Sequence, residues 1–199
     1  MMVQNIGVVG AGTMGSGIAQ TCAVNGLSVV MHDMSDDLLE KGLKTIEHSL
    51  DRLVAREKLS DGDKSEALAR IRCSTELDAL SESGLVVEAA TENMDIKIPI
   101  FESLNQICGP DAILASNTSS LSLTTLAAAS GRPDKIIGMH FFNPVPLMKL
   151  VEIIRALQTS DKTYEVTESL TRALGKEPIA VKDSPGFVVN RMLVPMINE

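Results

Sequence analysis

The sequence has few aromatic residues and no tryptophan. Its 199 residues include one Tyr and four Phe, so aromatic side chains make up 3% of the chain. With 44% hydrophobic residues, any core must therefore be built from aliphatic side chains, with ten Met residues as adaptable filling. A chain of this length can bury such a core as one domain, or as one domain and a fragment of another.

Cysteine and positive charge are also scarce. The three cysteines, Cys22, Cys73 and Cys108, are far apart and form no Cys-x-x-Cys pair, so we expect reduced thiols in a cytoplasmic protein. The net charge of −8 and the lack of a basic run argue against a nucleic-acid partner. The first strand begins almost at Met1 and no apolar run is long enough to span a membrane, so we expect neither signal peptide nor membrane partner. We expect no metal site.

A glycine-rich motif near the start of the chain is the strongest local signal. An apolar run at residues 6–9 is typical of a buried strand, and a helical pattern begins at Met14. Between them, Gly10 permits a tight turn, Gly12 lets a pyrophosphate approach the backbone, and Gly15 lets the helix pack on the strand. The free N–H groups at the start of the helix would then face the phosphates. The cofactor-binding residues expected here are Gly10, Gly12, Thr13, Met14 and Gly15.

An acidic residue follows the second strand at the expected distance. Residues 27–32 read as a strand that ends at Asp33, about 20 residues after the motif, where a dinucleotide site needs a carboxylate for the adenosine ribose. Asp33 would repel a 2′-phosphate, and no Arg or Lys follows it before Lys41. The sequence therefore favours NAD over NADP.

Strands and helices alternate through the rest of the chain. Further strands are expected at 73–75, 85–89, 112–115, 136–142, 149–154 and 178–181. Helices are expected at about 95–108, 122–129 and 161–174, with Gly175 as the last stop signal. This order predicts an α/β protein with a Rossmann-type, doubly wound, mostly parallel sheet.

Two segments do not belong to a plain nucleotide-binding unit. Residues of about 36–72 predict an inserted helical hairpin: a long amphipathic helix, a break at 60–63, and a short helix that includes Ile71. Residues 183–186 are expected to open a very apolar helix that includes Phe187 and kinks or breaks at Pro195. The outer face of the hairpin carries the basic residues Lys41, Lys44, His48, Arg52, Arg56 and Lys58. Acidic residues are mixed among them, so charge alone favours a solvated face.

Three polar stretches stand out together with the glycine motif. They are Ser116-Asn117-Thr118-Ser119-Ser120-Leu121, the run His140-Phe141-Phe142-Asn143-Pro144 through Glu152, and Pro185-Gly186-Phe187-Val188-Val189-Asn190-Arg191. With these motifs the chain closely resembles the 3-hydroxyacyl-CoA dehydrogenase family over its whole length, and within it the short-chain 3-hydroxybutyryl-CoA dehydrogenases. The resemblance implies NAD as cofactor and oxidation of (S)-3-hydroxyacyl-CoA to 3-oxoacyl-CoA.

The resemblance also implies residue roles. His140 matches the catalytic base, Glu152 the carboxylate that orients it, and Ser119 and Asn190 the groups that hold substrate oxygens. Glu92, Lys97, Ser119 and Asn143 match residues on the ribose and nicotinamide side of the cofactor. Ser49 matches a CoA contact, and Arg56 stands where relatives carry Lys, so that a cation for a CoA phosphate is kept.

Physical reasoning about these residues agrees with those roles. A His with a pKa near neutrality suits a reversible proton transfer, and a carboxylate twelve residues later could fix its tautomer. Nothing in the sequence places a second base beside Ser119, so we interpret it as a hydrogen-bond donor and not as a nucleophile. Lys149 and Lys176 are interpreted as solvated charges.

The resemblance implies a longer protein, in which an all-helical second domain forms a homodimer and covers the active site. We therefore expect an NAD-binding domain at 1–184 and the first helix of that second domain at 185–199. Without the cover, the 199-residue chain is expected to bind NAD but to turn over weakly. Two alternatives remain open: a sugar-acid or other β-hydroxyacid dehydrogenase, which typically uses Lys at the position of His140, and a non-catalytic NAD-binding relative.

Overall fold

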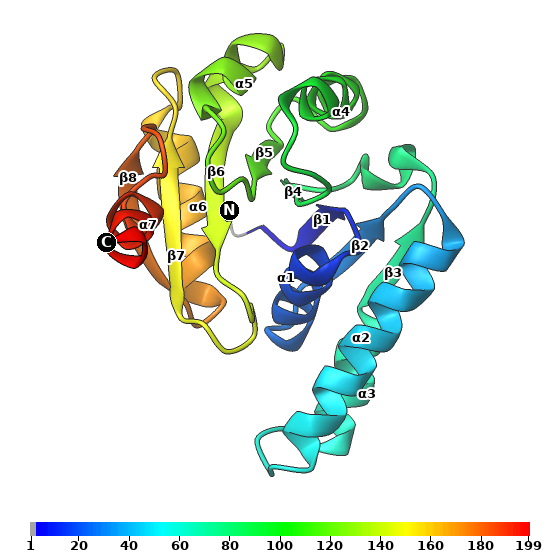
Figure 1. Cartoon of the computed structure of the whole chain (residues 1–199). Helices are drawn as coiled ribbons and strands as arrows, with labels where there is room; N and C mark the ends of the chain where they lie inside the picture. Colours follow the sequence, from blue (N-terminus) through cyan, green and yellow to red (C-terminus); the bar gives the residue numbers. More distant parts are fainter. Residues whose placement is uncertain (1–2) are drawn as a thin grey trace.

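A single mixed sheet organises the molecule. The computed structural model describes residues 3–199, which form an eight-stranded sheet in the order β3-β2-β1-β4-β5-β6-β7-β8 with helices on both faces (Figure 1). The strands are β1 (Asn5–Val9), β2 (Ser28–His32), β3 (Ile71–Ser74), β4 (Leu85–Glu88), β5 (Ile113–Ser116), β6 (Ile136–Phe141), β7 (Leu150–Arg155) and β8 (Glu177–Lys182). All neighbouring strands are parallel except β6 and β7, which run antiparallel. The predicted doubly wound, mostly parallel α/β fold is confirmed.

The helices lie where the alternating pattern predicts them, within one or two residues in most cases. They are α1 (Thr13–Val24), α2 (Asp36–Val54), α3 (Asp61–Ala69), α4 (Met94–Ile107), α5 (Leu123–Ala129), α6 (Asp161–Ala173) and α7 (Val189–Asn198), with short 3₁₀ turns η1 (Leu77–Leu80) and η2 (Pro133–Lys135). Ser122 accepts a hydrogen bond from the backbone N–H of Thr125 and so is the N-cap of α5.

The sheet has a buried apolar layer on each face. On one face, side chains such as Val8 pack with residues of α1, α2 and α6. On the other, the next residue along β1, Val9, packs with residues of α4 and α5, including Phe101 and Leu126. Successive strand residues point to opposite faces, so a strand covered on both sides must be apolar throughout. The short aliphatic runs of the sequence are therefore the centre of the fold.

The helical hairpin is present, but its second helix begins earlier than the sequence indicates. Ser60 accepts a hydrogen bond from the backbone N–H of Asp63, and the Asp63 carboxylate accepts one from the backbone N–H of Ser60. This capping box satisfies free N–H groups at the first turn, so the segment expected as a break is the start of α3. Ile71, expected in that helix, instead begins β3.

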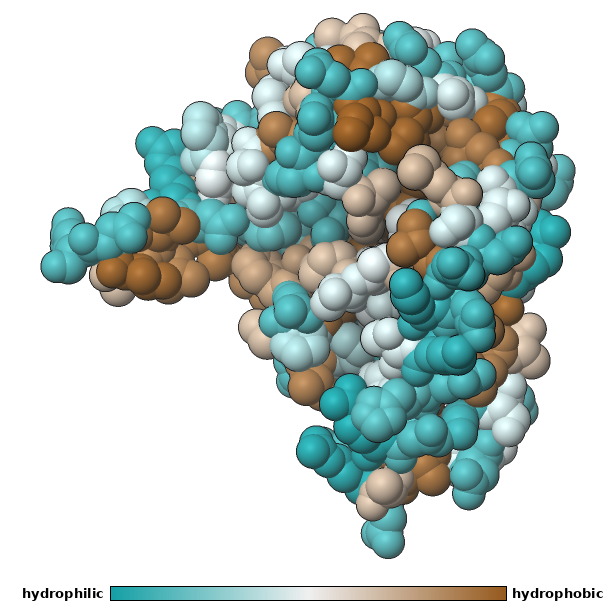
Figure 2. Space-filling model, turned by 45° about the vertical axis from the view of Figure 1, so that its right-hand side comes forward, coloured by the Kyte–Doolittle hydropathy of each residue, from teal (hydrophilic) through white to brown (hydrophobic). Residues whose placement is uncertain are grey.

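The last helix also differs from expectation. Phe187 lies in a turn with φ +52° and is 1% exposed, so it belongs to the core and not to the helix. α7 begins at Val189 and continues through Pro195 without a break. It projects from the body, where Figure 2 shows a brown patch on the arm at the left. Its exposed apolar residues are Met192, Leu193, Val194, Met196 and Ile197. Among the described residues no helix has the length and apolar character needed to cross a membrane.

Candidate active site

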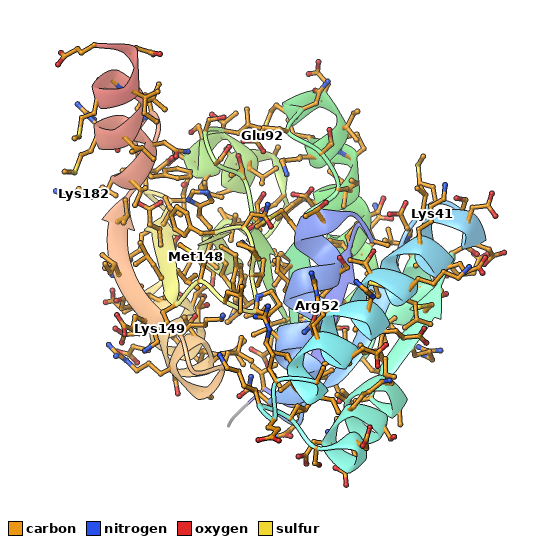
Figure 3. All side chains as sticks on the ribbon, turned by 60° about the horizontal axis from the view of Figure 1, so that its bottom comes forward. Lys41, Arg52, Glu92, Met148, Lys149 and Lys182 are labelled. Carbon is orange, nitrogen blue, oxygen red and sulfur yellow. The ribbon has the colours of Figure 1, made fainter. Side chains whose placement is uncertain are left out.

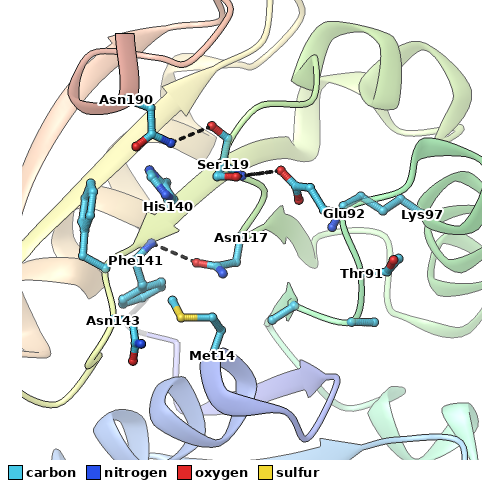
Figure 4. Close-up of a pocket in the computed structure, with 13 residues that line it drawn as sticks. Met14, Thr91, Glu92, Lys97, Asn117, Ser119, His140, Phe141, Asn143 and Asn190 are labelled. Atoms are coloured by element: carbon cyan, nitrogen blue, oxygen red, sulfur yellow. Dashed lines mark hydrogen bonds between the residues drawn. The ribbon is translucent and has the colours of Figure 1, made fainter. Parts of the chain in front are cut away.

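A pocket of about 370 Å³ opens where the parallel strands end. Its walls come from the first turn of α1, from the loops after β4, β5 and β6, and from the first turn of α7 (Figure 4). In an open α/β sheet this edge is where ligands bind. The lining includes Met14, Glu92, Lys97, Ser119, His140, Asn143 and Asn190, all of them expected from the sequence, and also Asn117.

His140 and Glu152 are paired across the antiparallel strands β6 and β7. The two residues are in register, and His140 Nδ1 lies 2.7 Å from Glu152 Oε2. Both are buried, at 7% and 1% exposure. A carboxylate only accepts, so Nδ1 carries the ring proton and Nε2 keeps its lone pair for the pocket that His140 lines.

The carboxylate of Glu152 is itself held in place. Its other oxygen, Oε1, accepts hydrogen bonds from the backbone N–H groups of Val188 and Val189 at 3.0 and 2.9 Å. The turn before α7 therefore fixes the orienting group of the pair. The ring centroids of Phe142 and Phe187 lie 4.5 and 5.8 Å from the centroid of the His140 imidazole, so both rings cover it with apolar surface.

Glu92 gathers four donors on one oxygen. Glu92 Oε1 accepts from Thr118 Oγ1, from the backbone N–H and Oγ of Ser119, and from Ser120 Oγ, all at 2.8 to 3.0 Å. Burial alone would raise the pKa of Glu92, but the hydrogen bonds from Thr118, Ser119 and Ser120 outweigh it and hold that pKa below its ordinary value.

This cluster changes the interpretation of Ser119. A carboxylate does lie beside its hydroxyl, at 2.9 Å, although the sequence suggested no such neighbour. Because the pKa of Glu92 is lowered, its carboxylate is a poor base for generating a nucleophile. The single hydroxyl proton of Ser119 is directed to Glu92, so in this arrangement Oγ can only accept a hydrogen bond from a ligand.

The end of the chain reaches the same loop. Asn190, in the first turn of α7, donates from Nδ2 to the backbone oxygen of Ser119 at 3.4 Å. Asn117, which sequence reasoning did not single out, accepts from the backbone N–H of Phe141 at 2.9 Å and so holds the loop after β5 against β6. The sequence signal for Asn117 was its position within the polar stretch from Ser116 to Leu121.

The glycine turn has the geometry that a dinucleotide requires. Gly10 has φ +101°, and a Cβ there would lie 2.7 Å from the Ala89 carbonyl oxygen. A Cβ on Gly15 would lie 1.8 Å from the Gly10 oxygen, so the helix could not pack so closely with any side chain there. A Cβ on Gly12 would meet nothing within 4 Å, which leaves the backbone N–H groups open to a pyrophosphate.

Asp33 is tied to the turn. Its Oδ2 accepts from the backbone N–H of Ala11 and its Oδ1 from that of Met34, both at 2.7 Å. Each oxygen keeps a further lone pair, so the carboxylate can still accept the two hydroxyls of a ribose. The residues present therefore fit the adenosine half of NAD.

Lys97 is in the pocket wall, but its charge is already paired. Its ammonium is 2.5 Å from Glu88 Oε2, and the residues are 1% and 0% exposed. Glu88 also accepts from Ser116 Oγ and from the backbone N–H of Ala90, both at 2.9 Å. Sequence reasoning missed Glu88. The signal that could have found it is a single carboxylate at the end of an otherwise apolar strand, where burial requires a partner.

The two residues predicted to contact CoA lie outside this pocket. Ser49 is on α2 and Arg56 follows the end of that helix, so neither lines the cavity around His140. Figure 3 shows the neighbouring Lys41 and Arg52 spaced along α2, apart from the loop that carries Met148 and Lys149. The interpretation of Lys176 as a solvated charge is wrong: it is buried, whereas Lys149 is exposed. Among residues 3–199 no cluster of His, Cys, Asp or Glu could hold a metal ion.

An imidazole–carboxylate pair at the edge of a dinucleotide-binding sheet defines the class of nicotinamide-dependent dehydrogenases. Residues 5–184 match the family model described as the 3-hydroxyacyl-CoA dehydrogenase, NAD binding domain. The chain therefore belongs to the 3-hydroxyacyl-CoA dehydrogenase family, and it contains that family's NAD-binding domain.

Individual relatives agree with the family match. The chain is 46% identical over 198 residues to the 3-hydroxybutyryl-CoA dehydrogenase of Bradyrhizobium diazoefficiens, covering 100% of this chain and 68% of that protein. It is 45% identical over 206 residues to human mitochondrial hydroxyacyl-coenzyme A dehydrogenase, covering 65% of that protein. The crystal structure of (S)-3-hydroxybutyryl-CoA dehydrogenase from Ralstonia eutropha superimposes with a TM-score of 0.97 at 59% identity, over 98% of this chain and 69% of that one.

Proposed function

We propose that the protein carries out the NAD-dependent oxidation of (S)-3-hydroxyacyl-CoA, with 3-hydroxybutanoyl-CoA as a substrate, and the reverse reduction of acetoacetyl-CoA. The observation that supports this most directly is the His140–Glu152 pair, 2.7 Å apart at the wall of the pocket. The sugar-acid and β-hydroxyacid dehydrogenases considered from the sequence would place a Lys where His140 stands. A non-catalytic relative is expected to have lost a catalytic residue, whereas this chain keeps His140, Glu152, Ser119 and Asn190.

The proton of the 3-hydroxyl group is taken by His140 Nε2. Glu152 holds Nδ1–H, so the ring presents its basic nitrogen to the substrate and the positive charge that forms is stabilised by a neighbouring carboxylate. NAD, when bound, supplies the acceptor for the hydride that leaves C3. Phe142 and Phe187 keep water from one side of the ring.

Ser119 and Asn190 hold the substrate oxygens in different ways. Ser119 directs its proton to Glu92 in the free chain, so it holds the substrate oxygen by turning its hydroxyl from Glu92 and donating to that oxygen, while the substrate proton faces His140 Nε2. Asn190 Nδ2 makes only a long bond of 3.4 Å and can donate to a carbonyl oxygen. Glu92 and Asn143 line the side of the pocket assigned to the nicotinamide ribose, and Lys97 supports that wall through Glu88.

The CoA part of the substrate would extend beyond the pocket toward the hairpin. Arg56 is exposed and Ser49 half-buried there. An exposed guanidinium suits a phosphate, and the same hairpin carries further basic residues for a polyanion, among them Lys41, Lys44, Arg52 and Lys58. We assign Ser49 and Arg56 to CoA.

We place the enzyme in the cytoplasm and assign residues 1–184 to the NAD-binding domain. The exposed apolar residues of α7 support its role as the first helix of a helical domain, at 185–199, through which the longer enzyme dimerises. The relatives extend beyond the segment that aligns with this chain, in keeping with such a domain.

The deciding assay follows NADH oxidation by the 199-residue chain with acetoacetyl-CoA and with acetoacetate. We expect slow turnover of the thioester, none of the free acid, and loss of at least about 100-fold on His140→Gln with NADH binding retained. Equal rates with the two substrates would remove the case for CoA. Unchanged turnover in His140→Gln would contradict the assignment of the base.

A further inference from the structure

The loop from Phe142 to Lys149 connects the two halves of the imidazole–carboxylate pair. It leaves β6 just after His140 and enters β7 just before Glu152. Its first two residues, Phe142 and Asn143, line the pocket. The position of this loop therefore sets one wall of the reactive site.

Lys176 holds this loop from a distant part of the chain. It lies between the end of α6 and the start of β8, and its ammonium donates to the backbone oxygens of Val145 and Met148 at 2.5 and 2.8 Å. The residue is 8% exposed, and in the described part of the chain no carboxylate pairs with it. Two loop carbonyls are thus the partners of a buried cation.

Such a cation is costly to bury. Desolvation lowers the pKa of Lys176. The nearby Cys22 does not neutralise it, because burial raises the pKa of that thiol to about 12. A loop that only had to connect two strands could leave its carbonyls to water, as most surface loops do.

The loop also packs against α1. Val145 is 2% exposed and packs on Gly17, where an added Cβ would lie 2.9 Å from Val145 Cβ. The helix that begins at the glycine turn and the loop that carries Asn143 are therefore in direct contact. Lys176 donates to the backbone oxygen of Val145, so it holds the residue that makes this contact.

We propose that Lys176 is a positioning residue for the nicotinamide half of NAD. It acts through the loop, by holding Phe142 and Asn143 at the pocket wall, and touches neither cofactor nor substrate. The adenosine half depends on other groups, the glycine turn and Asp33, which the loop does not carry. Loss of the Lys176 ammonium should therefore affect the two halves of the cofactor unequally.

Titration calorimetry of the 199-residue chain with NAD and with ADP-ribose, which lacks the nicotinamide ring, separates the two halves. Lys176→Met keeps the apolar stem and removes the donors. We expect it to weaken NAD binding by about tenfold and ADP-ribose binding by less than about twofold. Lys176→Arg, which keeps a cation, should recover part of the loss.

Lys149→Met is the matched control, since Lys149 is exposed on the same loop; it should bind both ligands as the parent does. Val145→Ala loosens the same loop without touching the cation, and should show the same inequality to a smaller degree. If Lys176→Met does not fold, Val145→Ala decides the matter. Equal loss for NAD and ADP-ribose, or no loss for either, in the deciding variant would overturn the proposal.

Discussion

His140 and Glu152 lie directly opposite one another on antiparallel strands, with Nδ1 and Oε2 2.7 Å apart. Twelve residues separate them in the sequence, and the turn between β6 and β7 closes that distance. Because Glu152 also accepts hydrogen bonds from the backbone N–H groups of Val188 and Val189 at the start of α7, the pair links the sheet to the last helix. The orientation of the proposed base and the attachment of α7 thus depend on the same carboxylate.

Glu152→Gln tests the orienting role. A carboxamide can offer its N–H₂ to Nδ1, which would leave the ring proton on Nε2 and remove the base. We expect turnover to fall by about 10²- to 10⁴-fold while NAD affinity changes little. Steady-state rates and calorimetry on the same samples measure both. A rate within threefold of the parent would contradict the role.

Glu92→Gln tests the cluster of donors around one oxygen. The pKa of Glu92 is lowered in the folded chain, so its contribution to stability is present above the ordinary value of 4.5 and is lost as the pH falls through the lowered one. The variant should be less stable than the parent at pH 7, and the difference should shrink in acid. Urea titrations at a series of pH values measure it, with exposed Glu102→Gln as control. A difference independent of pH would contradict the prediction.

Asp33→Ala tests the choice of cofactor. The change removes the acceptor for the ribose hydroxyls and for the Ala11 N–H, so NAD affinity should fall by about 10- to 100-fold. Without the Asp33 carboxylate a 2′-phosphate is no longer repelled, so the ratio of the affinities for NAD and NADP should become smaller. Fluorescence titration with NADH and NADPH checks both expectations. The exposed neighbour Asp37→Ala should leave both affinities unchanged.

Lys97→Met tests the buried ion pair beneath the pocket. It leaves the carboxylate of Glu88, which is 0% exposed, without its cation. Removing one partner of such a pair costs about 3 to 5 kcal/mol of stability. The double variant Glu88→Gln/Lys97→Met should recover part of this, since a neutral amide needs no counter-charge. Equilibrium unfolding measures the free energy of unfolding of the parent, Lys97→Met and the double variant, with exposed Lys162→Met as control.

Much of the fold could be predicted from the sequence because its strands, turns and helix starts depend on residues close together in the chain. The aliphatic strands, the glycine turn and the N-cap at Ser122 depend on neighbours a few residues away. The predictions that were wrong concern segments whose local sequence is compatible with two structures. Ser60 and Asp63 form a capping box, so the segment begins a helix and is not a loop. Phe187 lies outside the helix because its ring is buried in the core.

The sequence by itself determined the strand and helix order, the dinucleotide turn with Asp33, and the residue types available for a base and its carboxylate. Only the tertiary structure decided how the charges are used. Glu88 neutralises Lys97, Glu92 collects the donors of the loop after β5, and Lys176 is buried against two carbonyls. The reason is physical: the state of a charge depends on burial and on partners within hydrogen-bond distance, and these partners come from segments far apart in the chain.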